Sequence, residues 1–207
     1  MMINGLTVDD IRLALTRPLP GVTAQVRLAP PSRIEQLYQA PPADARPAGV
    51  LIVVYPRDGA LHFLLTRRTD GVDKHKGQIS LPGGQQEDGE SLLDTALRET
   101  REEVGVAIDA AAVLGVLSPV YIPPTGFLIT PYVAALPDRP HFAVMHREVA
   151  ELIEAPLAAL FDPAIVRREM WMLRGVEIEV PFFQIGPHKV WGATAMVLSE
   201  FAAAIGS

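Results

Sequence analysis

The sequence predicts a single domain of the α/β (α+β) class, in which helices cover a mixed sheet. Three observations lead to this prediction. An unbroken apolar run over 50–55 is typical of a buried strand. Apolar residues recur at helical spacing over 91–104, and an Ala-rich stretch over 191–205 predicts a last helix. With 207 residues, the chain is long enough for one well-filled core and short for two.

The N-terminal part predicts a short helix and then an irregular arm. Thr7 and Asp10 have the spacing of a capping box ahead of an apolar stripe. Five prolines over 28–48 argue against a regular element there. We therefore expect residues 1–47 to form a helix and a proline-rich arm, and residues 48–207 to form the functional domain.

Patterned segments separated by turn signals predict the remaining elements. In chain order they are a strand at 49–55, a turn at 56–59, a strand at 61–66 that pairs back as a hairpin, a loop at 71–84, a helix at 91–104 ended by Gly105, strands at 113–118, 127–136 and 149–154, a short helix after Pro156, a hairpin of 168–174 and 176–185, and a C-terminal helix at 191–205.

Composition excludes several classes of function. The absence of Cys excludes disulfides, a thiol nucleophile and Cys-ligated metals. A net charge of −6 argues against broad nucleic-acid binding, although it allows a small nucleotide substrate. No apolar run approaches the ~20 residues of a membrane span. The first residues lack the basic start of a secretory signal, so we expect a cytoplasmic protein with no membrane partner.

Three carboxylates gather on one face of the predicted helix at 91–104. At 100° per residue, Glu99, Glu102 and Glu103 lie within about 100° of arc. Such close like charges repel one another unless a cation neutralises them. Oxygen ligands without nearby His or Cys suit Mg²⁺ or Mn²⁺. For three glutamates alone, a solvated acidic helix face is the alternative explanation.

The segment around this helix resembles the Nudix box, G-x5-E-x7-R-E-U-x-E-E-x-G-U, in which U is a bulky apolar residue. The matching residues are Gly84, Glu90, Arg98, Glu99, Glu102, Glu103, Gly105 and Val106. Thr100 is the one departure, since an aliphatic residue is expected there. The resemblance implies a Nudix fold, with a mixed β-sheet sandwiched between helices, over residues 48–207. It also implies hydrolysis of a nucleoside diphosphate linked to another group.

The same resemblance suggests roles for the acidic residues. Glu99 and Glu103 are expected to bind the metal, and Glu102 is expected either to bind it or to orient water. Arg98 would shape the loop and helix of the box. In many family members a later glutamate completes the metal site or acts as base, and Glu148 lies in that region. A simple charge at a strand edge is the alternative for Glu148.

The stretch before the box resembles the signature of the coenzyme A (CoA) pyrophosphatase branch, roughly L-L-T-x-R-[SA]-x3-R-x3-G-x3-F-P-G-G. Matches are found at Leu64, Leu65, Thr66, Arg68, Gly77, Pro82, Gly83 and Gly84. Thr69 and Leu81 are mild departures, whereas Asp73 reverses the charge of an expected arginine. This resemblance implies cleavage of CoA to 4′-phosphopantetheine and adenosine 3′,5′-bisphosphate. Another Nudix substrate (ADP-ribose, NADH or a dinucleotide) and a catalytically silent nucleotide sensor are the alternatives.

The phosphates of such a substrate need cations and closely approaching backbone. The candidate substrate-binding residues are Arg67, Arg68, His75, Lys76, Gly83 and Gly84. Trp191, at the start of the last helix, is interpreted as a core side chain, and base stacking is the less favoured alternative. The oligomeric state is left open.

Overall fold

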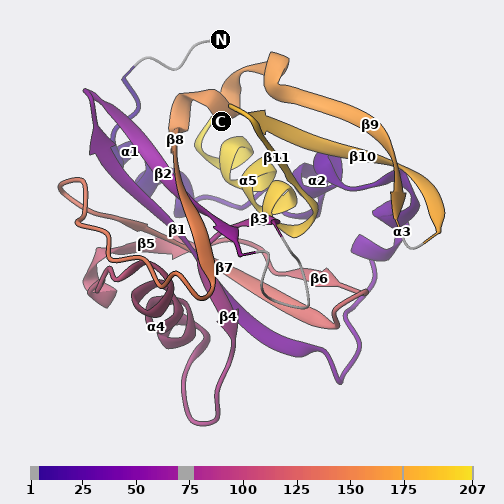
Figure 1. The fold of residues 1–207 in the computed structure, drawn as a ribbon, viewed down its shortest axis with the longest axis horizontal. Coiled ribbons are helices and arrows are strands. Elements are labelled where there is room, and N and C mark those ends of the chain that lie inside the picture. The colour runs from indigo at the N-terminus through magenta and orange to yellow at the C-terminus, as the bar shows by residue number, and fades with distance from the viewer. Residues whose placement is uncertain (1–4, 70–76, 174, 207) are drawn as a thin grey trace.

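The structure is a computed structural model that describes residues 5–69, 77–173 and 175–206. Within these residues the chain forms a mixed sheet of eight strands and an antiparallel sheet of three strands, with helices packed around them (Figure 1). The α+β class predicted from the sequence is confirmed. No helix in the described ranges is long and apolar enough to span a membrane.

In the described part of the chain, five short helices precede the first strand, and the two longest helices are α4 and the C-terminal α5. The α-helices are α1 (Val8–Leu15), α2 (Val22–Gln25), α3 (Ile34–Leu37), α4 (Leu92–Val104) and α5 (Gly192–Ile205). The 3₁₀ helices are η1 (Val26–Leu28), η2 (Pro31–Arg33), η3 (Ala110–Ala112), η4 (Leu157–Phe161) and η5 (Pro163–Ile165).

The strands of the large sheet are β1 (Arg46–Arg57), β2 (Ala60–Arg68), β3 (Ile79–Ser80), β4 (Gly83–Gln85), β5 (Val113–Val116), β6 (Val120–Ile122), β7 (Phe127–Ala135) and β8 (Val149–Pro156). The strand order along its main path is β3-β2-β1-β7-β5. Outside this path, β4 pairs with β1, β6 pairs with β7 and β8 pairs with β2. Since β1 and β7 are parallel and the other pairs are antiparallel, the sheet is mixed. The small sheet has the order β11-β10-β9, formed by β9 (Val166–Leu173), β10 (Val176–Ile185) and β11 (His188–Trp191).

Both faces of the large sheet are buried, which explains the unbroken apolar run of β1. Leu51 and Val53 belong to the hydrophobic cluster that includes α4 residues. Ile52 and Val54, on the opposite face, belong to the cluster that includes α5 residues. A strand covered on both sides loses the polar alternation of a half-exposed strand. The sheet therefore holds α4 on one face and α5 on the other.

Helix α4 has defined ends and a fixed position against β1. Ser91 and Asp94 form a capping box at its start, and Gly105 ends it in the left-handed region at φ +75°. A Cβ on Gly49 of β1 would lie 2.3 Å from the carbonyl oxygen of Leu92. Glycine at position 49 therefore lets the first turn of α4 approach the sheet directly.

The N-terminal segment packs into the same core as the C-terminal helix. Ile11 and Leu28 are buried in the cluster on the α5 face. The amide of Gln25 donates a 2.7 Å hydrogen bond to Glu200 of α5, and both side chains are almost fully buried. The predicted boundary at residue 48 stays a prediction, but the preceding segment is a structural part of the fold.

Several predictions about irregular segments were wrong. The arm contains short helices, and β1 begins at Arg46. The described part of the expected loop at 71–84 contains β3 and β4, and neither β6 nor β11 was expected. Strands of two to four residues are too short to show a period of two, so their pairing partners define them. In the arm, Pro31 occupies the first turn of η2, where its missing N–H costs no hydrogen bond.

Candidate active site

The acidic residues of α4 lie where this helix faces the Gly83–Gly84 segment of β4. Gly83 and Gly84 pair with Val50 and Gly49 of β1, so β4 is fixed against the sheet. A Cβ on Gly84 would lie 2.4 Å from the carboxyl carbon of Glu99. The absence of a side chain at Gly84 therefore makes room for the Glu99 carboxylate.

Glu103 is the most deeply buried carboxylate of the site, with 4% of the residue exposed. Burial, together with the charges of Glu99 and Glu148, raises its pKa to about 8, against the lowering effect of Arg68. Its Oε2 atom is buried without a hydrogen-bond partner among the described residues. A buried carboxylate oxygen without a partner is costly, which makes it a candidate ligand atom.

Glu99 shares this environment. Burial raises the pKa of Glu99, and the charges of Glu102 and Glu148 act in the same direction, while hydrogen bonding to Arg98 lowers it. Glu99 and Glu103 are one helical turn apart, and the charge of Glu99 contributes to the raised pKa of Glu103.

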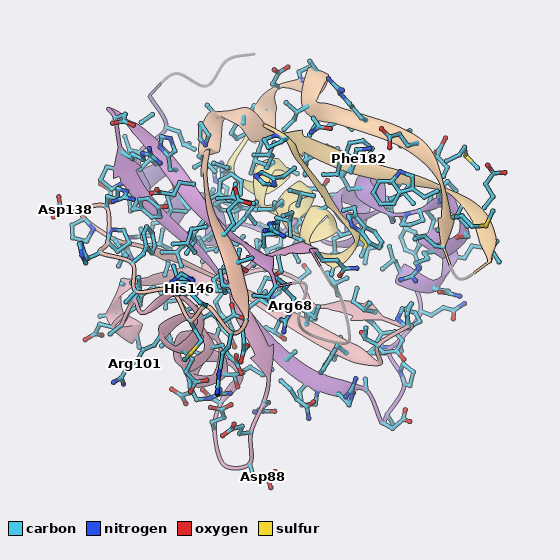
Figure 2. The ribbon with its side chains drawn as sticks, in the orientation of Figure 1. Arg68, Asp88, Arg101, Asp138, His146 and Phe182 are labelled. Carbon is cyan, nitrogen blue, oxygen red and sulfur yellow. The ribbon has the colours of Figure 1, made fainter. Side chains whose placement is uncertain are left out.

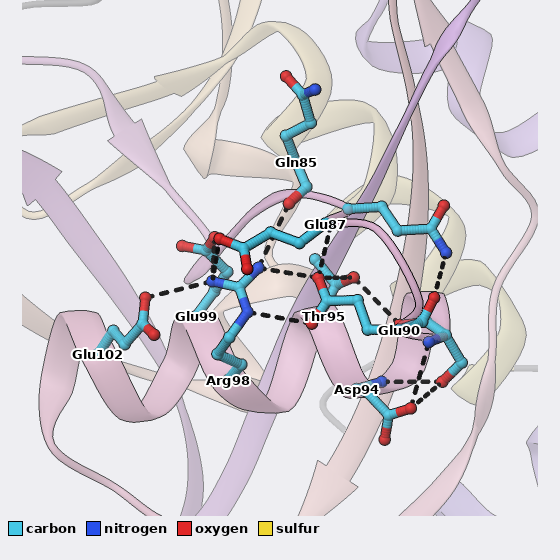
Figure 3. Close-up of polar contacts among 10 residues, drawn as sticks. Gln85, Glu87, Glu90, Asp94, Thr95, Arg98, Glu99 and Glu102 are labelled. Carbon is cyan, nitrogen blue, oxygen red and sulfur yellow. Dashed lines mark hydrogen bonds and ion pairs between the residues drawn. The ribbon is translucent and has the colours of Figure 1, made fainter.

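Arg98 organises the loop and helix of the box (Figure 3). Its Nε and Nη2 atoms donate to the two oxygens of Glu90 at 3.0 and 2.9 Å, which lowers the pKa of Glu90 to about 2. Its Nη1 donates to Glu99 at 2.8 Å, and its Nη2 reaches the backbone oxygen of Gln85 at 3.3 Å. Arg98 therefore links the β4–α4 loop to the carboxylate face of the helix.

Glu102 lies outside this buried pair. More than half of its side chain is exposed, and it accepts a 3.2 Å hydrogen bond from Arg98. It also lines a groove of about 540 Å³ between α4 and residues 143–145. No group of three His, Asp or Glu side chains in the described ranges is arranged as a metal-binding cluster. Burial therefore distinguishes Glu99 and Glu103 from the more exposed Glu102.

The two arginines of β2 point in opposite directions, as neighbours on a strand do. Arg68, labelled in Figure 2, has its Nη1 atom 3.9 Å from Glu103 Oε1, so Arg68 faces Glu103. Arg67 donates a 3.1 Å hydrogen bond to Glu151 of β8. The structure brings Arg68 into the site and places Arg67 on the other face of the sheet.

Glu148 reaches the site from the segment before β8. Its charge raises the pKa of both Glu99 and Glu103, so the three carboxylates interact electrostatically. The backbone of Thr69 donates to the Glu148 carbonyl at 2.9 Å, and the Thr69 hydroxyl donates to Arg147, which ties this segment to the end of β2. Sequence reasoning had placed Glu148 in this later region, and the fold brings it to the carboxylates.

The segment that carries Glu148 is held at two places that the sequence did not indicate. Met145 and Ala143 donate backbone hydrogen bonds to the last carbonyls of α4. Farther back, Arg139 makes a bidentate contact at 2.8 Å with Glu154 of β8. Because these partners are distant in sequence, no local motif could have identified them.

Two predicted substrate-binding residues, His75 and Lys76, lie outside the described residues. Gly83 is described and has φ +152°. A Cβ there would lie 2.4 Å from the backbone oxygen of Gly49. Packing against β1 therefore already explains glycine at position 83.

The donor set fits a hard divalent cation. Glu99 and Glu103 offer oxygen atoms only, and the negative charge of Glu99 raises the pKa of Glu103. Among the described residues, the buried Oε2 atom of Glu103 has no hydrogen-bond partner. The side chain that would crowd Glu99 is missing at Gly84. These properties suit Mg²⁺ or Mn²⁺ better than softer metals.

Comparison with known proteins agrees with this geometry. The NUDIX domain model matches residues 45–171. An uncharacterized Nudix hydrolase NudL from Yersinia enterocolitica is 37% identical over 175 residues, which cover 81% of this chain and 87% of the relative. The human mitochondrial coenzyme A diphosphatase NUDT8 is 34% identical over 194 residues, which cover 92% of this chain and 75% of the relative.

A solved structure supports the fold. The crystal structure of a MutT/nudix family protein from Enterococcus faecalis aligns with a TM-score of 0.56 at 18% identity, covering 90% of this chain and 73% of the other. The fold, the box residues around α4 and these matches agree. The chain belongs to the Nudix hydrolase family, and it is a hydrolase of phosphoanhydride bonds.

Proposed function

We propose that this enzyme cleaves the pyrophosphate of CoA with the help of Mg²⁺ or Mn²⁺. The products would be 4′-phosphopantetheine and adenosine 3′,5′-bisphosphate. The observation that carries the proposal is the position of Arg68, which matches the CoA signature and faces the buried Glu103. The human relative named as a CoA diphosphatase supports it, while the NudL relatives are uncharacterized.

Each residue of the site has a role in this proposal. Glu99 and Glu103 hold the cation, which supplies charge neutralisation for the phosphate oxygens and a lowered pKa for water. Arg68 binds a phosphate oxygen through its guanidinium. Arg98 keeps Glu99 and the β4–α4 loop in place. Glu148, held close to the carboxylate pair, accepts the proton of the attacking water, and Glu102 orients that water from the outer side.

A second candidate is hydrolysis of another nucleotide derivative. Asp73 favours it, because the CoA signature has an arginine at that position. A catalytically silent sensor is disfavoured, since every carboxylate of the box is present. Cytoplasmic location, as expected from the sequence, is part of the proposal.

A comparison of substrates tests the proposal. The purified full-length enzyme with Mg²⁺ or Mn²⁺ is assayed against CoA, ADP-ribose, NADH and a dinucleoside polyphosphate, and the products are identified by mass. We expect kcat/KM to be highest for CoA. A wide preference for ADP-ribose over CoA would overturn the substrate assignment but leave the phosphoanhydride chemistry intact.

A further inference from the structure

An aromatic cluster on the small sheet has no role in the chemistry described so far. Trp171 of β9 stacks on Phe182 of β10 with ring centroids 5.8 Å apart and an interplanar angle of 27°. Trp191 of β11 meets Trp171 edge-on at 5.3 Å. Phe182 is fully buried, whereas both tryptophans are partly exposed. Phe182 is therefore a core side chain, whereas Trp191, which was expected in the core, is only partly buried.

The polar groups beside this aromatic cluster are paired with one another. The indole N–H of Trp171 donates to Glu169 at 2.8 Å, and the Lys189 ammonium contacts the same carboxylate at 2.6 Å. The ammonium also lies 5.6 Å from the Trp171 ring centroid. These contacts fix the Trp171 ring in one orientation and place the Lys189–Glu169 ion pair beside it.

The cluster is connected to the strands that build the active site. Figure 1 shows β11 beside β3, and the hydroxyl of Thr194 donates to the Ile79 carbonyl of β3 at 3.3 Å. At the other end of β11, His188 lies 3.3 Å from Glu151, the partner of Arg67. In sequence, Trp191 lies between His188 and Thr194, which make these two contacts. Strand β3 ends three residues before Gly83, the first residue of β4.

We propose that Trp171 and Trp191 form a stacking platform for the adenine ring of the nucleotide substrate. A purine offers a flat π surface that aromatic side chains bind without depending on particular hydrogen bonds. This inference rests on the proposed function, because it takes the substrate to be an adenine nucleotide.

The platform has a direct optical test, because Trp171 and Trp191 are the only tryptophans of the chain. The Mg²⁺-loaded enzyme is titrated with adenosine 3′,5′-bisphosphate, and tryptophan fluorescence is followed with excitation above the adenine absorption band. We expect saturable quenching. The matched titration with 4′-phosphopantetheine, which lacks a base, is expected to leave the fluorescence unchanged.

Kinetics of a variant give an independent test. Trp171→Leu is expected to raise the KM for CoA about 10-fold while kcat changes little, because stacking holds the base and not the reacting bond. Met172→Leu, at the exposed neighbour on the other face of β9, is the control and is expected to leave both constants unchanged. Any loss of folding in Trp171→Leu leaves the titration of the unmodified protein as the deciding measurement.

The outcomes separate the platform from the substrate assignment. If CoA is hydrolysed and the bisphosphate causes no quenching, or the same change as phosphopantetheine, the platform is refuted while the function stands. If another adenine nucleotide is the substrate, quenching by the bisphosphate and a raised KM for that nucleotide in Trp171→Leu still support the platform.

Discussion

Glu103→Gln should abolish activity and stabilise the metal-free protein at the same time. In the folded protein the pKa of Glu103 is about 8, against an ordinary value of 4.5. At pH 7 this difference costs the folded state about 3 kcal/mol. Glutamine keeps the size of the side chain and removes the charge. We therefore expect the variant to gain up to ~3 kcal/mol in free energy of unfolding at pH 7.

The sign of the pH dependence follows from the raised pKa. Below pH 4.5 the carboxyl is protonated in both states, and the variant has no advantage. As pH rises from 4.5 to about 8, the unfolded wild-type chain loses its proton first, so wild-type stability falls relative to the variant. A divalent cation at about 100 times its Kd should restore about 2.7 kcal/mol to the wild type and little to the variant.

Urea unfolding followed by circular dichroism, at several pH values with and without a chelator, measures these differences. Glu177→Gln, at an exposed carboxylate of β10, is the matched control and should not change the pH dependence. Parallel pH profiles for wild type and Glu103→Gln would refute the argument that Glu103 is held at an electrostatic cost.

Three further changes test other parts of the site and the fold. Gly84→Ala places a Cβ 2.4 Å from the Glu99 carboxyl carbon. We expect this variant to bind Mn²⁺ at least about tenfold more weakly, as measured by electron paramagnetic resonance. Unchanged binding would argue against Glu99 as a ligand. Arg98→Lys keeps the positive charge but loses the two parallel hydrogen bonds that the guanidinium donates to Glu90, so kcat should fall about 10–100-fold. Full activity would show that the charge alone suffices. Glu200→Ala removes a buried acceptor and should lower the free energy of unfolding by about 3 kcal/mol in denaturant titrations, with little effect on the KM for CoA.

The parts of the fold that the sequence predicts well are those with local signals. The turn between β1 and β2 is Asp58–Gly59, and both residues have positive φ, as a two-residue hairpin requires. Helix α4 covers Leu92–Val104 and stops at Gly105, as expected for the helix predicted at 91–104. These features depend on residues within a few positions of one another, so a single sequence contains them.

The missed features depend on long-range pairing. β4 consists of three residues, and only its register with β1 makes it a strand. The Gln25–Glu200 hydrogen bond joins residues that are 175 positions apart. Similarly, sequence spacing brought Glu99, Glu102 and Glu103 to one face, but burial distinguishes the exposed Glu102 from the other two.

The sequence also could not predict in which direction neighbouring side chains of a strand point. Arg67 and Arg68 were both candidates for substrate binding, since both are basic residues at the end of a strand, although only Arg68 matches the CoA signature. Only the register of β2 with β8 shows that Arg67 meets Glu151 while Arg68 meets Glu103. A one-residue shift in register would have exchanged these roles.

The most direct test of the central claim is the rate at which CoA yields 4′-phosphopantetheine with wild type, Glu103→Gln and Glu177→Gln under the same Mg²⁺ concentration. We predict cleavage by the wild type and by Glu177→Gln at equal rates, and a rate at least ~100-fold lower for Glu103→Gln with its folding intact. Unchanged turnover in Glu103→Gln, or a wild type that leaves CoA intact, would contradict the account.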